Sequence, residues 1–455
     1  MVSLDGVYKV EGAGTYLEAL TTVQQEISKS FKDMNLDDMT VDDVFRYKKT
    51  IEMIVMTNNL RCNEATVLSE LVDRLYNSMA KYDVLTKYLD PQVYMEMGIE
   101  EIYGRWDSIR IKCKQGKVLL PERFPSVQIA ANIFSKIAQK FNGQVNEGVP
   151  LALGEFAPNI RASFSGCPVT PEKLGGEFNI RIVHGSKMTR ELLIDSHTVS
   201  KDGLDFLELC IHHKVGICIS GGTGSGKTGT MYYLLSQVTK DATYRVGTIE
   251  IESREFDLIK YDENGNSIND VFSWVTRSSD DPRQNITANA LLQTILRFTP
   301  DIIGMGEMRD DEAAIACEAG ATGHGMITTT HADSAAATPL RLFTLCKKSE
   351  GSYDDRTVFS QIEQAFPIIV HQRKEMDGRT RRIYEIAEFL GCMNGEPLVK
   401  NIFEFVVTDN LQDKHIALGS FKQVGAISEK LKQKLLRNGA SNTEIAKYAK
   451  GGEQY

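Results

Sequence analysis

Apolar residues recur at helical spacing through residues 16–88, and this pattern predicts a helical N-terminal region. One stretch shows the repeat clearly, with apolar side chains at Val67, Leu68, Leu71, Val72, Leu75 and Met79. Residues three and four positions apart share one face of a helix, so each such helix can bury an apolar stripe. The region contains no proline, which would interrupt a helix.

The pattern changes after Asp90-Pro91 to shorter apolar runs. Residues 99–117 predict two short strands that close on Gln115 and Gly116. A helix is predicted over 127–141, and further strands over 160–164 and 178–183. These elements predict a small α/β domain.

The second half of the chain alternates strands with helices. After a linker at 196–200, helices are predicted over 203–213, 228–237 and 290–298, and strands over 215–220, 244–251, 301–306 and 326–331. Alternation of this kind is typical of a parallel sheet that is covered on both faces, with ligands at the carboxyl ends of its strands. Residues 261–269 are polar and predict a loop or hairpin.

Composition limits the possibilities further. A chain of 455 residues exceeds one compact core and predicts two or three domains. With 42% hydrophobic and 25% charged residues it has an ordinary globular composition. A net charge of -9 argues against a main surface that binds the nucleic-acid backbone.

The chain lacks an apolar run long enough for a membrane span, and its first twenty residues carry acids where a secretory signal would be basic or apolar. We therefore expect a protein that stays inside the cell. The eight cysteines include no Cys-x-x-Cys pair, so neither a zinc site nor a disulfide framework is expected.

Residues 221–228 form a complete Gly-x-x-x-x-Gly-Lys-Thr phosphate-binding loop (P-loop) between a predicted strand and a predicted helix. Glycines allow successive amides to approach phosphate oxygens, and the helix directs its positive end toward the same anion. A glycine turn without a ligand is the alternative. The candidate nucleotide-binding residues are Gly221, Gly222, Thr223, Gly224, Ser225, Gly226, Lys227 and Thr228.

Lys227 offers a cation for the outer phosphates, and the Thr228 hydroxyl is a candidate Mg²⁺ ligand. Glu307 follows the strand 301–306 and is the leading catalytic carboxylate and a second candidate metal ligand, the alternative being an exposed loop acid. Glu250, Glu252 and Glu255 follow the preceding strand. One of them is expected to be a second acid, and we select Glu252 and Glu255 as candidates.

Two histidines, His324 and His331, bracket the predicted strand 326–331. A γ-phosphate sensor and an ordinary hydrogen-bonded polar residue are equally compatible with this placement. Arginines suited to phosphate by their planar guanidinium stand at Arg161, Arg181, Arg277, Arg297 and Arg309, although each alone could be a surface charge.

Together these motifs resemble the secretion and traffic ATPases of type II and type IV secretion, conjugation and type IV pilus machines. The resemblance covers roughly residues 90–405, and its most specific segments are LLQTILRFTPDIIGMGEMRD at 291–310 and TGHGMITTTHAD at 322–333. It also includes the P-loop, the acidic box TIEIESREF at 248–256, IRASFSG at 160–166 and FNIRIVHG at 178–185. The closing segment RRIYEIAEFLG at 381–391 is most similar to the Tad-pilus assembly and conjugation branch.

Two features depart from the family pattern. The acidic box has Glu252 where the family usually has Asp, and the four-cysteine zinc element of the type II secretion and pilus-extension branch is absent.

The resemblance implies an α/β fold with a RecA-like P-loop ATPase core and a parallel sheet, preceded by a small α/β domain and an N-terminal helical region. The expected divisions are 1–85, 86–195 and 196–455, the last with a helical C-terminal part. It also implies a Mg²⁺-dependent ATPase that acts as a homohexamer on inner-membrane partners, peripherally attached to the cytoplasmic face of the membrane. Arg161 and Arg181, or Arg277, would then reach the phosphates of ATP.

Two other functions fit the P-loop. A GTP-type switch would carry an Asn-Lys-x-Asp motif, which the sequence lacks. A RecA-like DNA-translocating or strand-exchange ATPase should show a basic groove, and the pairs Lys347-Lys348 and Arg381-Arg382 are interpreted as solvated surface. No sequence-specific binding to nucleic acid is expected.

Overall fold

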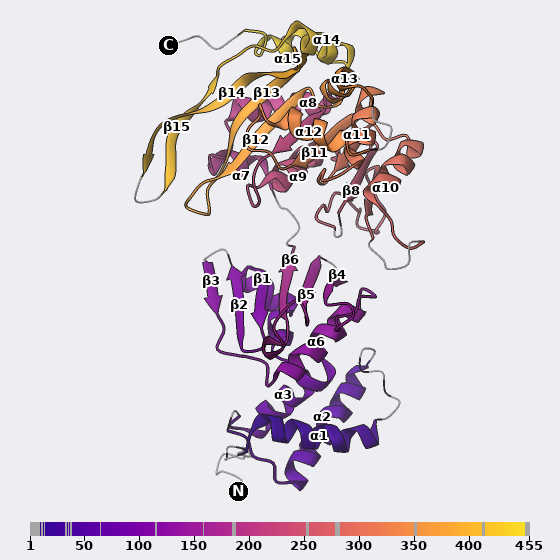
Figure 1. Ribbon diagram of the computed structural model, residues 1–455, viewed down its shortest axis with the longest axis vertical. Coiled ribbons are helices and arrows are strands. Elements are labelled where there is room, and N and C mark those ends of the chain that lie inside the picture. Colours follow the sequence, from indigo (N-terminus) through magenta and orange to yellow (C-terminus); the bar gives the residue numbers. More distant parts are fainter. Residues whose placement is uncertain are drawn as a thin grey trace. The chain divides into compact units, whose positions relative to one another are not determined.

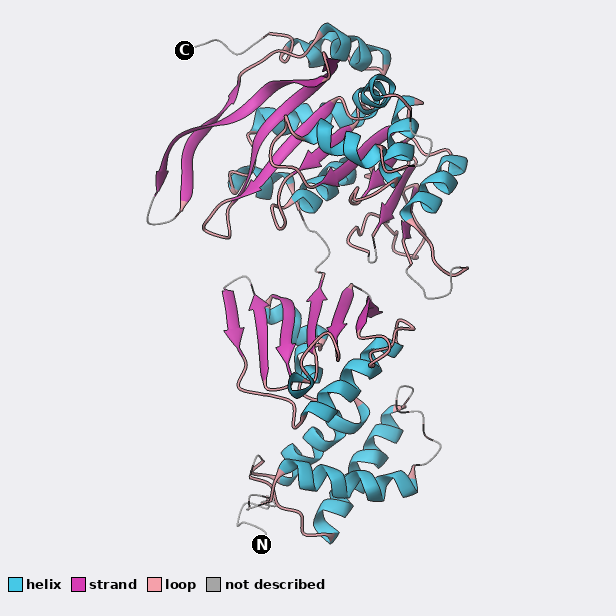
Figure 2. Cartoon of the chain, viewed as in Figure 1, coloured by secondary structure: helices cyan, strands magenta, loops and turns pink. Residues whose placement is uncertain are grey.

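The computed structural model describes residues 10, 12, 14–31, 34, 36, 39–63, 65–113, 116–157, 159–183, 188–251, 254–277, 283–349, 353–411 and 415–450. The chain divides into two units, Met1–His184 and Gly185–Tyr455, and each has its own sheet (Figures 1 and 2). The three-part division expected from the sequence stays a prediction.

The first unit begins with helices that pack around a shared apolar core. Val23, Ile51, Leu71 and Leu75 are fully buried in it, which confirms the helical N-terminal region. Capping boxes start α1 and α2, because a threonine side chain and an acid three residues later bond each other's backbone amides. These helices are α1 (Tyr16–Ser30), α2 (Val41–Thr57) and α3 (Leu68–Ala80). The short helices α4 (Leu85–Tyr88), which packs in the core of the following sheet, and α5 (Pro91–Met97) come next.

A six-stranded antiparallel sheet completes the first unit, in the order β3-β2-β1-β6-β5-β4. Its strands are β1 (Ile99–Arg105), β2 (Ser108–Cys113), β3 (Gly116–Leu119), β4 (Leu151–Ala157), β5 (Ile160–Ser165) and β6 (Glu177–Ile182). Buried and exposed residues alternate along β6, so one face of the sheet packs on α6 (Val127–Gln139) and the other face carries polar side chains. A short 3-10 helix, Glu172–Leu174, precedes β6.

The structure differs from the prediction of two strands over 99–117. Arg105 pairs with Ser108, so the chain already turns at Trp106 and Asp107, and three strands result. The Arg105 guanidinium donates to the Asp107 carboxylate within this turn. The sequence pattern missed this turn, which has no glycine at its centre. Gln115, in the turn that the sequence did predict, lies outside the described residues.

The second unit is built on a nine-stranded sheet in the order β15-β14-β13-β12-β7-β11-β10-β8-β9. The six strands from β12 to β9 run parallel, which confirms the predicted parallel α/β core. They are β7 (Ile217–Ser220), β8 (Val246–Glu250), β9 (Val271–Val275), β10 (Ile302–Met305), β11 (Gly325–Thr330) and β12 (Ile368–Lys374).

Helices cover both faces of this sheet, because successive strand residues point to opposite sides and both sets are apolar. Ile217 and Ile219 pack with α7 (Arg190–Asp195), α8 (Lys201–His212), α9 (Lys227–Val238), α14 (Glu429–Arg437) and α15 (Asn442–Ala446). Cys218 packs in the core on the other face with α10 (Ala288–Ile295), α11 (Glu312–Ala321), α12 (Thr338–Cys346) and α13 (Asp355–Ala365). The short 3-10 helix Leu296–Phe298 extends α10.

Three long antiparallel strands extend the sheet beyond β12, and the sequence pattern did not predict their length. They are β13 (Arg381–Met393), β14 (Glu396–Leu411) and β15 (Ile416–Gln423). Figure 1 shows β14 and β15 as a ribbon at the edge of the sheet, and α14 and α15 follow it. Among the described residues, none of the helices is both long enough and apolar enough to cross a membrane.

The packing predicts that Ile303→Ala destabilises the second unit by about 2–5 kcal/mol, since Ile303 is fully buried in β10. The chain has two tryptophans, Trp106 in the first unit and Trp274 in the second. Urea unfolding followed by fluorescence in a Trp106→Phe background therefore reports the second unit alone. The control Ile268→Ala, at a side chain 51% exposed, should change stability by less than about 0.5 kcal/mol. Equal effects of the two substitutions would contradict the described core.

Candidate nucleotide-binding site

Parallel pairing brings four strand ends to one edge of the second unit's sheet. Thr330 pairs with Ser220, and Met305 pairs with both Thr328 and Ile249. The residues that follow β7, β8, β10 and β11 therefore share the carboxyl edge, where parallel α/β sheets bind ligands.

The P-loop connects β7 to α9 at this edge. Three of its glycines have positive φ angles, +149° at Gly221, +73° at Gly224 and +94° at Gly226. A Cβ atom on Gly222 would meet no heavy atom within 4 Å, so one side of the loop is open. A loop with this backbone, followed directly by a helix N-terminus, can bind a phosphate through its main-chain amides.

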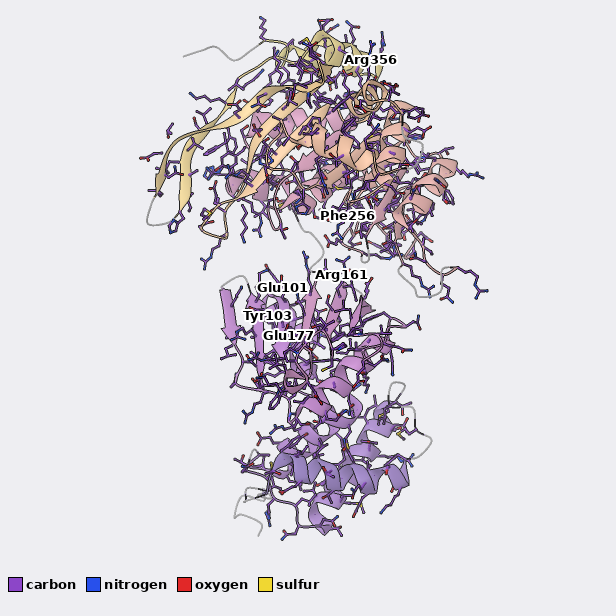
Figure 3. The ribbon with its side chains drawn as sticks, viewed as in Figure 1. Glu101, Tyr103, Arg161, Glu177, Phe256 and Arg356 are labelled. Carbon is purple, nitrogen blue, oxygen red and sulfur yellow. The ribbon has the colours of Figure 1, made fainter. Side chains whose placement is uncertain are left out.

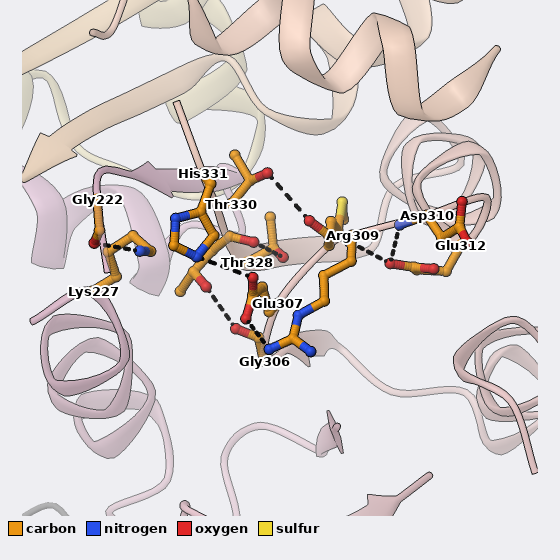
Figure 4. A network of polar contacts seen from close by, with 12 residues as sticks. Gly222, Lys227, Gly306, Glu307, Arg309, Asp310, Glu312, Thr328, Thr330 and His331 are labelled. Atoms are coloured by element: carbon orange, nitrogen blue, oxygen red, sulfur yellow. Dashed lines mark hydrogen bonds and ion pairs between the residues drawn. The ribbon is translucent and has the colours of Figure 1, made fainter. Parts of the chain in front are cut away.

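Lys227 is the first residue of α9, and its side chain folds back over the loop. Its Nζ donates to the carbonyl oxygen of Gly221 at 2.8 Å. It also donates to the carbonyl oxygen of Gly222 at 3.0 Å (Figure 4). The side chain is buried, and burial lowers its pKa, while the Glu307 carboxylate acts in the opposite direction. The Lys227 ammonium group thus lies within the loop whose bound phosphates it is expected to contact.

Thr228 and Glu307 offer the hard oxygen ligands that Mg²⁺ prefers. Thr228 is half-buried, and its hydroxyl makes no side-chain hydrogen bond among the described residues. The described part of the chain also contains no cluster of three or more His, Cys, Asp and Glu that could hold a metal by itself. This donor set fits Mg²⁺, which binds beside phosphates through one or two protein oxygens.

The segment carrying Glu307 is fixed by its neighbours. The Gly306 amide donates to Ile249 O of β8 at 2.8 Å, and the Met308 amide donates to Thr329 O of β11 at 2.8 Å. Thr329 and Thr330 in turn donate their hydroxyls to the Gly306 and Met308 carbonyls, at 2.8 and 3.2 Å. The threonine-rich strand therefore holds the Glu307 backbone at the carboxyl edge.

Both oxygens of the Glu307 carboxylate face cationic or donor groups (Figure 4). Oε2 accepts from Arg309 Nη2 at 2.8 Å, and Oε1 lies 3.3 Å from His331 Nε2. Burial alone would raise the pKa of Glu307, but the Arg309 hydrogen bond and the charges of Arg309, His331 and Lys227 lower it below its usual value. Burial and the Lys227 charge lower the pKa of His331. At neutral pH the site therefore holds an ionised carboxylate and a neutral imidazole.

The acidic box after β8 contains one buried acid with a clear structural role. Glu250 Oε2 accepts from the Glu255 and Phe256 amides, and Glu250 Oε1 accepts from the Ser273 hydroxyl at 3.1 Å. Burial raises the pKa of Glu250 to about 7, although these hydrogen bonds act in the opposite direction. Glu255 is half-buried, and Glu252 lies outside the described residues. The assignment of Glu252 and Glu255 as catalytic acids remains a prediction.

The two histidines occupy opposite ends of β11, as the six-residue strand between them requires. His331 lies beside Glu307, whereas His324 Nδ1 lies 2.8 Å from the Pro300 carbonyl at the amino edge. Seven extended residues span roughly 20 Å. Of these two histidines, only His331 lies at the P-loop edge.

The candidate arginines are distributed over both units. Arg161 and Arg181 are a cross-strand pair on the polar face of the first unit's sheet, flanked by Glu155 and Glu101 (Figure 3). In the second unit Arg277 is exposed and donates to Gln284 Oε1 at 3.0 Å. Arg297 is exposed in the 3-10 helix after α10, and Arg309 bonds Glu307. A role of Arg161, Arg181 or Arg277 toward phosphate stays a prediction.

The sequence suggested that the pair Arg381-Arg382 is solvated surface; Arg381 is exposed, but for Arg382 this interpretation is wrong. Arg382 is buried, with its guanidinium 4.0 Å from the centroid of the Phe405 ring, and it donates to Ala417 O. Arg381 Nε donates to the Gly224 carbonyl of the P-loop at 3.0 Å. Local sequence could not show this contact, because 157 positions separate the two residues.

The loop and the parallel sheet define a P-loop nucleotide-binding core. A model of the Type II/IV secretion system protein family matches residues 152–443, and the chain belongs to this family. The match runs from β4 to the start of α15 and therefore includes elements of both units.

Several named proteins are similar to parts of the chain. Type II secretion system protein E of Dickeya dadantii is 29% identical over 50% of this chain and 42% of its own length. Protein VirB11 of Agrobacterium fabrum is 31% identical over 40% of this chain and 49% of its own length. Competence protein ComGA of Bacillus subtilis is 32% identical over 31% of this chain and 36% of its own length. The chain thus spans half or less of the length of these relatives.

Solved structures are similar at a lower level. The ATPase DotB of Legionella pneumophila is 18% identical, with a TM-score of 0.49, over 80% of this chain and 87% of that chain. The VirB11 ATPase of Brucella suis, in complex with sulphate, is 19% identical, with a TM-score of 0.35, over 67% of this chain and 94% of that chain.

The site geometry predicts a pH-dependent stability carried by Glu250. The pKa of its carboxyl is about 4.5 in the unfolded chain and about 7 in the folded chain. Between these pH values the folded chain therefore keeps a proton that the unfolded chain has lost. The free energy of unfolding therefore falls as the pH rises between these values. From about pH 6 to about pH 8, wild type should lose about 1.4 kcal/mol relative to Glu250→Gln. Urea unfolding followed at Trp274 measures the difference. A pH-independent difference would contradict the raised pKa.

Proposed function

We propose that this chain is an ATPase that powers a type IV secretion, conjugation or pilus-assembly apparatus. The observation that carries the proposal is the open P-loop after β7 with Lys227 inside it, and the Glu307 carboxylate after β10, two strands away on the same edge. Membership of the Type II/IV secretion system protein family supports the same conclusion.

In this proposal the amides of residues 221–228 bind the β- and γ-phosphates of ATP, and Lys227 turns from the loop carbonyls to the outer phosphates. Glu307 orients the attacking water, because its lowered pKa keeps it ionised as an acceptor. His331 lies against Glu307 and is the candidate sensor of the terminal phosphate. Thr228, with Glu307 acting through water, would hold Mg²⁺, which neutralises charge on the transferred phosphoryl group.

The assembled form that we propose is a homohexamer on the cytoplasmic face of the inner membrane, bound to membrane components of the machine. The missing four-cysteine element argues against the type II secretion and pilus-extension branch. Arg161 and Arg181 are the candidates for stabilising the transition state across a subunit boundary, and Arg277 is a third. Hydrolysis would then depend on assembly.

Two substitutions test the site. Lys227→Ala should lower the ATPase rate by about 10²-fold or more, since it removes a cation from the phosphates. Glu307→Gln should lower kcat by about 10²- to 10⁴-fold while nucleotide binding persists. Steady-state phosphate release and binding of a fluorescent ADP analogue measure these effects. Lys240→Ala and Glu318→Gln replace exposed residues outside the site and are the matched controls. A wild-type rate in Lys227→Ala would refute the assignment.

The arginine proposal has its own test. Arg161→Ala combined with Arg181→Ala should lower kcat by about 10³-fold or more if these side chains act on the transition state. Arg110→Ala, an exposed arginine on the same face of the sheet, should not. A mixture of the double variant with Glu307→Gln should recover part of the activity, because some interfaces then combine an intact carboxylate with intact arginines. Absence of recovery in a mixed oligomer would contradict action across subunits.

A further inference from the structure

Residues at the end of β12 and the start of β13 form one wall of the P-loop. Three hydrogen-bonded pairs join this wall to the loop and its flanking residues, and the partners are 142, 151 and 157 positions apart in the sequence. His371 of β12 pairs with Ser220, the last residue before the loop. Its Nδ1 lies 3.3 Å from Ser220 Oγ, and its Nε2 is buried without a hydrogen-bond partner among the described residues. The loop is therefore backed by the last strand of the parallel core.

Gln372 contacts the loop through both its backbone and its side chain. A Cβ atom on Gly221 would lie 1.9 Å from Gln372 O, so the two backbones touch at a spacing that only glycine permits. The Thr230 hydroxyl of α9 donates to Gln372 Oε1 at 2.9 Å, and both side chains are buried. Gln372 thus joins the start of the loop to the first turn of the following helix.

Arg381 completes the wall from the first position of β13. Its Nε donates to the Gly224 carbonyl, and its Nη1 donates to the Arg379 carbonyl at 3.3 Å. A Cβ atom on Gly226 would lie 2.8 Å from Arg381 Cδ, so the side chain also runs along this glycine. Arg381 is exposed and belongs to the hairpin that leads into the long antiparallel strands.

These contacts act on a segment that has little order of its own. Glycine has more backbone freedom to lose than any other residue, so a glycine-rich loop must be ordered by its surroundings before it binds an anion. The bond from Arg381 occupies the Gly224 carbonyl and uses none of the loop amides. A loop already held in its binding conformation loses less entropy when the phosphate arrives.

We propose that Gln372 and Arg381 are positioning residues for the P-loop, and that through them the β12–β13 hairpin sets the affinity for nucleotide. This inference rests on the proposed function, because it assumes that the loop binds a nucleotide. Neither residue is assigned to the hydrolytic step itself. The effect is therefore expected in Kd and KM, with kcat largely unchanged.

Arg381→Ala is the first test, with Arg379→Ala as the matched control. Arg379 is an exposed arginine of the same turn, and its substitution keeps the backbone carbonyl that Arg381 contacts. Arg381→Ala should raise Kd for a fluorescent ADP analogue and KM for ATP about 3- to 10-fold, which corresponds to one lost hydrogen bond. Its kcat should stay within about twofold of wild type, and Arg381→Lys should recover part of the affinity. The unliganded thermal midpoint should stay unchanged in all three variants.

A double-mutant cycle tests Gln372. If Thr230→Val and Gln372→Leu each act by breaking the same bond, the double variant should raise Kd no more than the larger single effect. Independent roles would make the two effects multiply, and would overturn the positioning role of Gln372. If either variant is too unstable to assay, the Kd and KM of Arg381→Ala alone test the inference.

The outcomes separate the two proposals. Wild type that neither binds the ADP analogue nor hydrolyses ATP would refute the proposed function. Wild type that is active, with Arg381→Ala equal to it in Kd and KM, would refute only the positioning role. An equal rise in Kd for Arg379→Ala would also refute it, because the effect would then follow from lost positive charge.

Discussion

The parallel pairing of the central strands is the constraint on which the site depends. Because β12, β7, β11, β10 and β8 run in the same direction, the P-loop, the acidic box, Glu307 and His331 emerge at one edge. The strands can stay in this arrangement because both faces are apolar and covered by helices. The positions of the polar groups thus follow from the burial of residues that take no part in chemistry.

Within the second unit, the charged side chains at this edge are already held and oriented by their neighbours. The Lys227 ammonium is already buried against main-chain carbonyls, which lowers its pKa through burial and keeps it close to where phosphates would lie. Glu307 is ionised and oriented by Arg309 and His331, so its acceptor oxygens need little rearrangement. Glu250 has a different role, since burial raises its pKa and its carboxylate accepts hydrogen bonds from the Glu255 and Phe256 amides.

Much of this site could be predicted from sequence, because the P-loop, Glu307 and His331 each follow a short strand within one local motif. The strands that carry Arg161 and Arg181 were also predicted. The remaining features depend on long-range contacts. Gln372 and Arg381 reach the P-loop only through sheet pairing, and β13 and β14 exceed the usual strand length and pair with shifts in register. His324 and His331 were predicted at the two ends of one strand, and the structure places His324 at the opposite edge from His331, while the sensor role of His324 stays a prediction.

The most direct test of the central claim is an experimental structure of the full chain with Mg²⁺ and a non-hydrolysable ATP analogue. The account predicts main-chain amides of residues 221–228 around the β-phosphate, Lys227 on the outer phosphates, and Glu307 facing the terminal phosphate. A nucleotide bound away from this loop, or a Glu307 side chain directed away from the terminal phosphate, would contradict it.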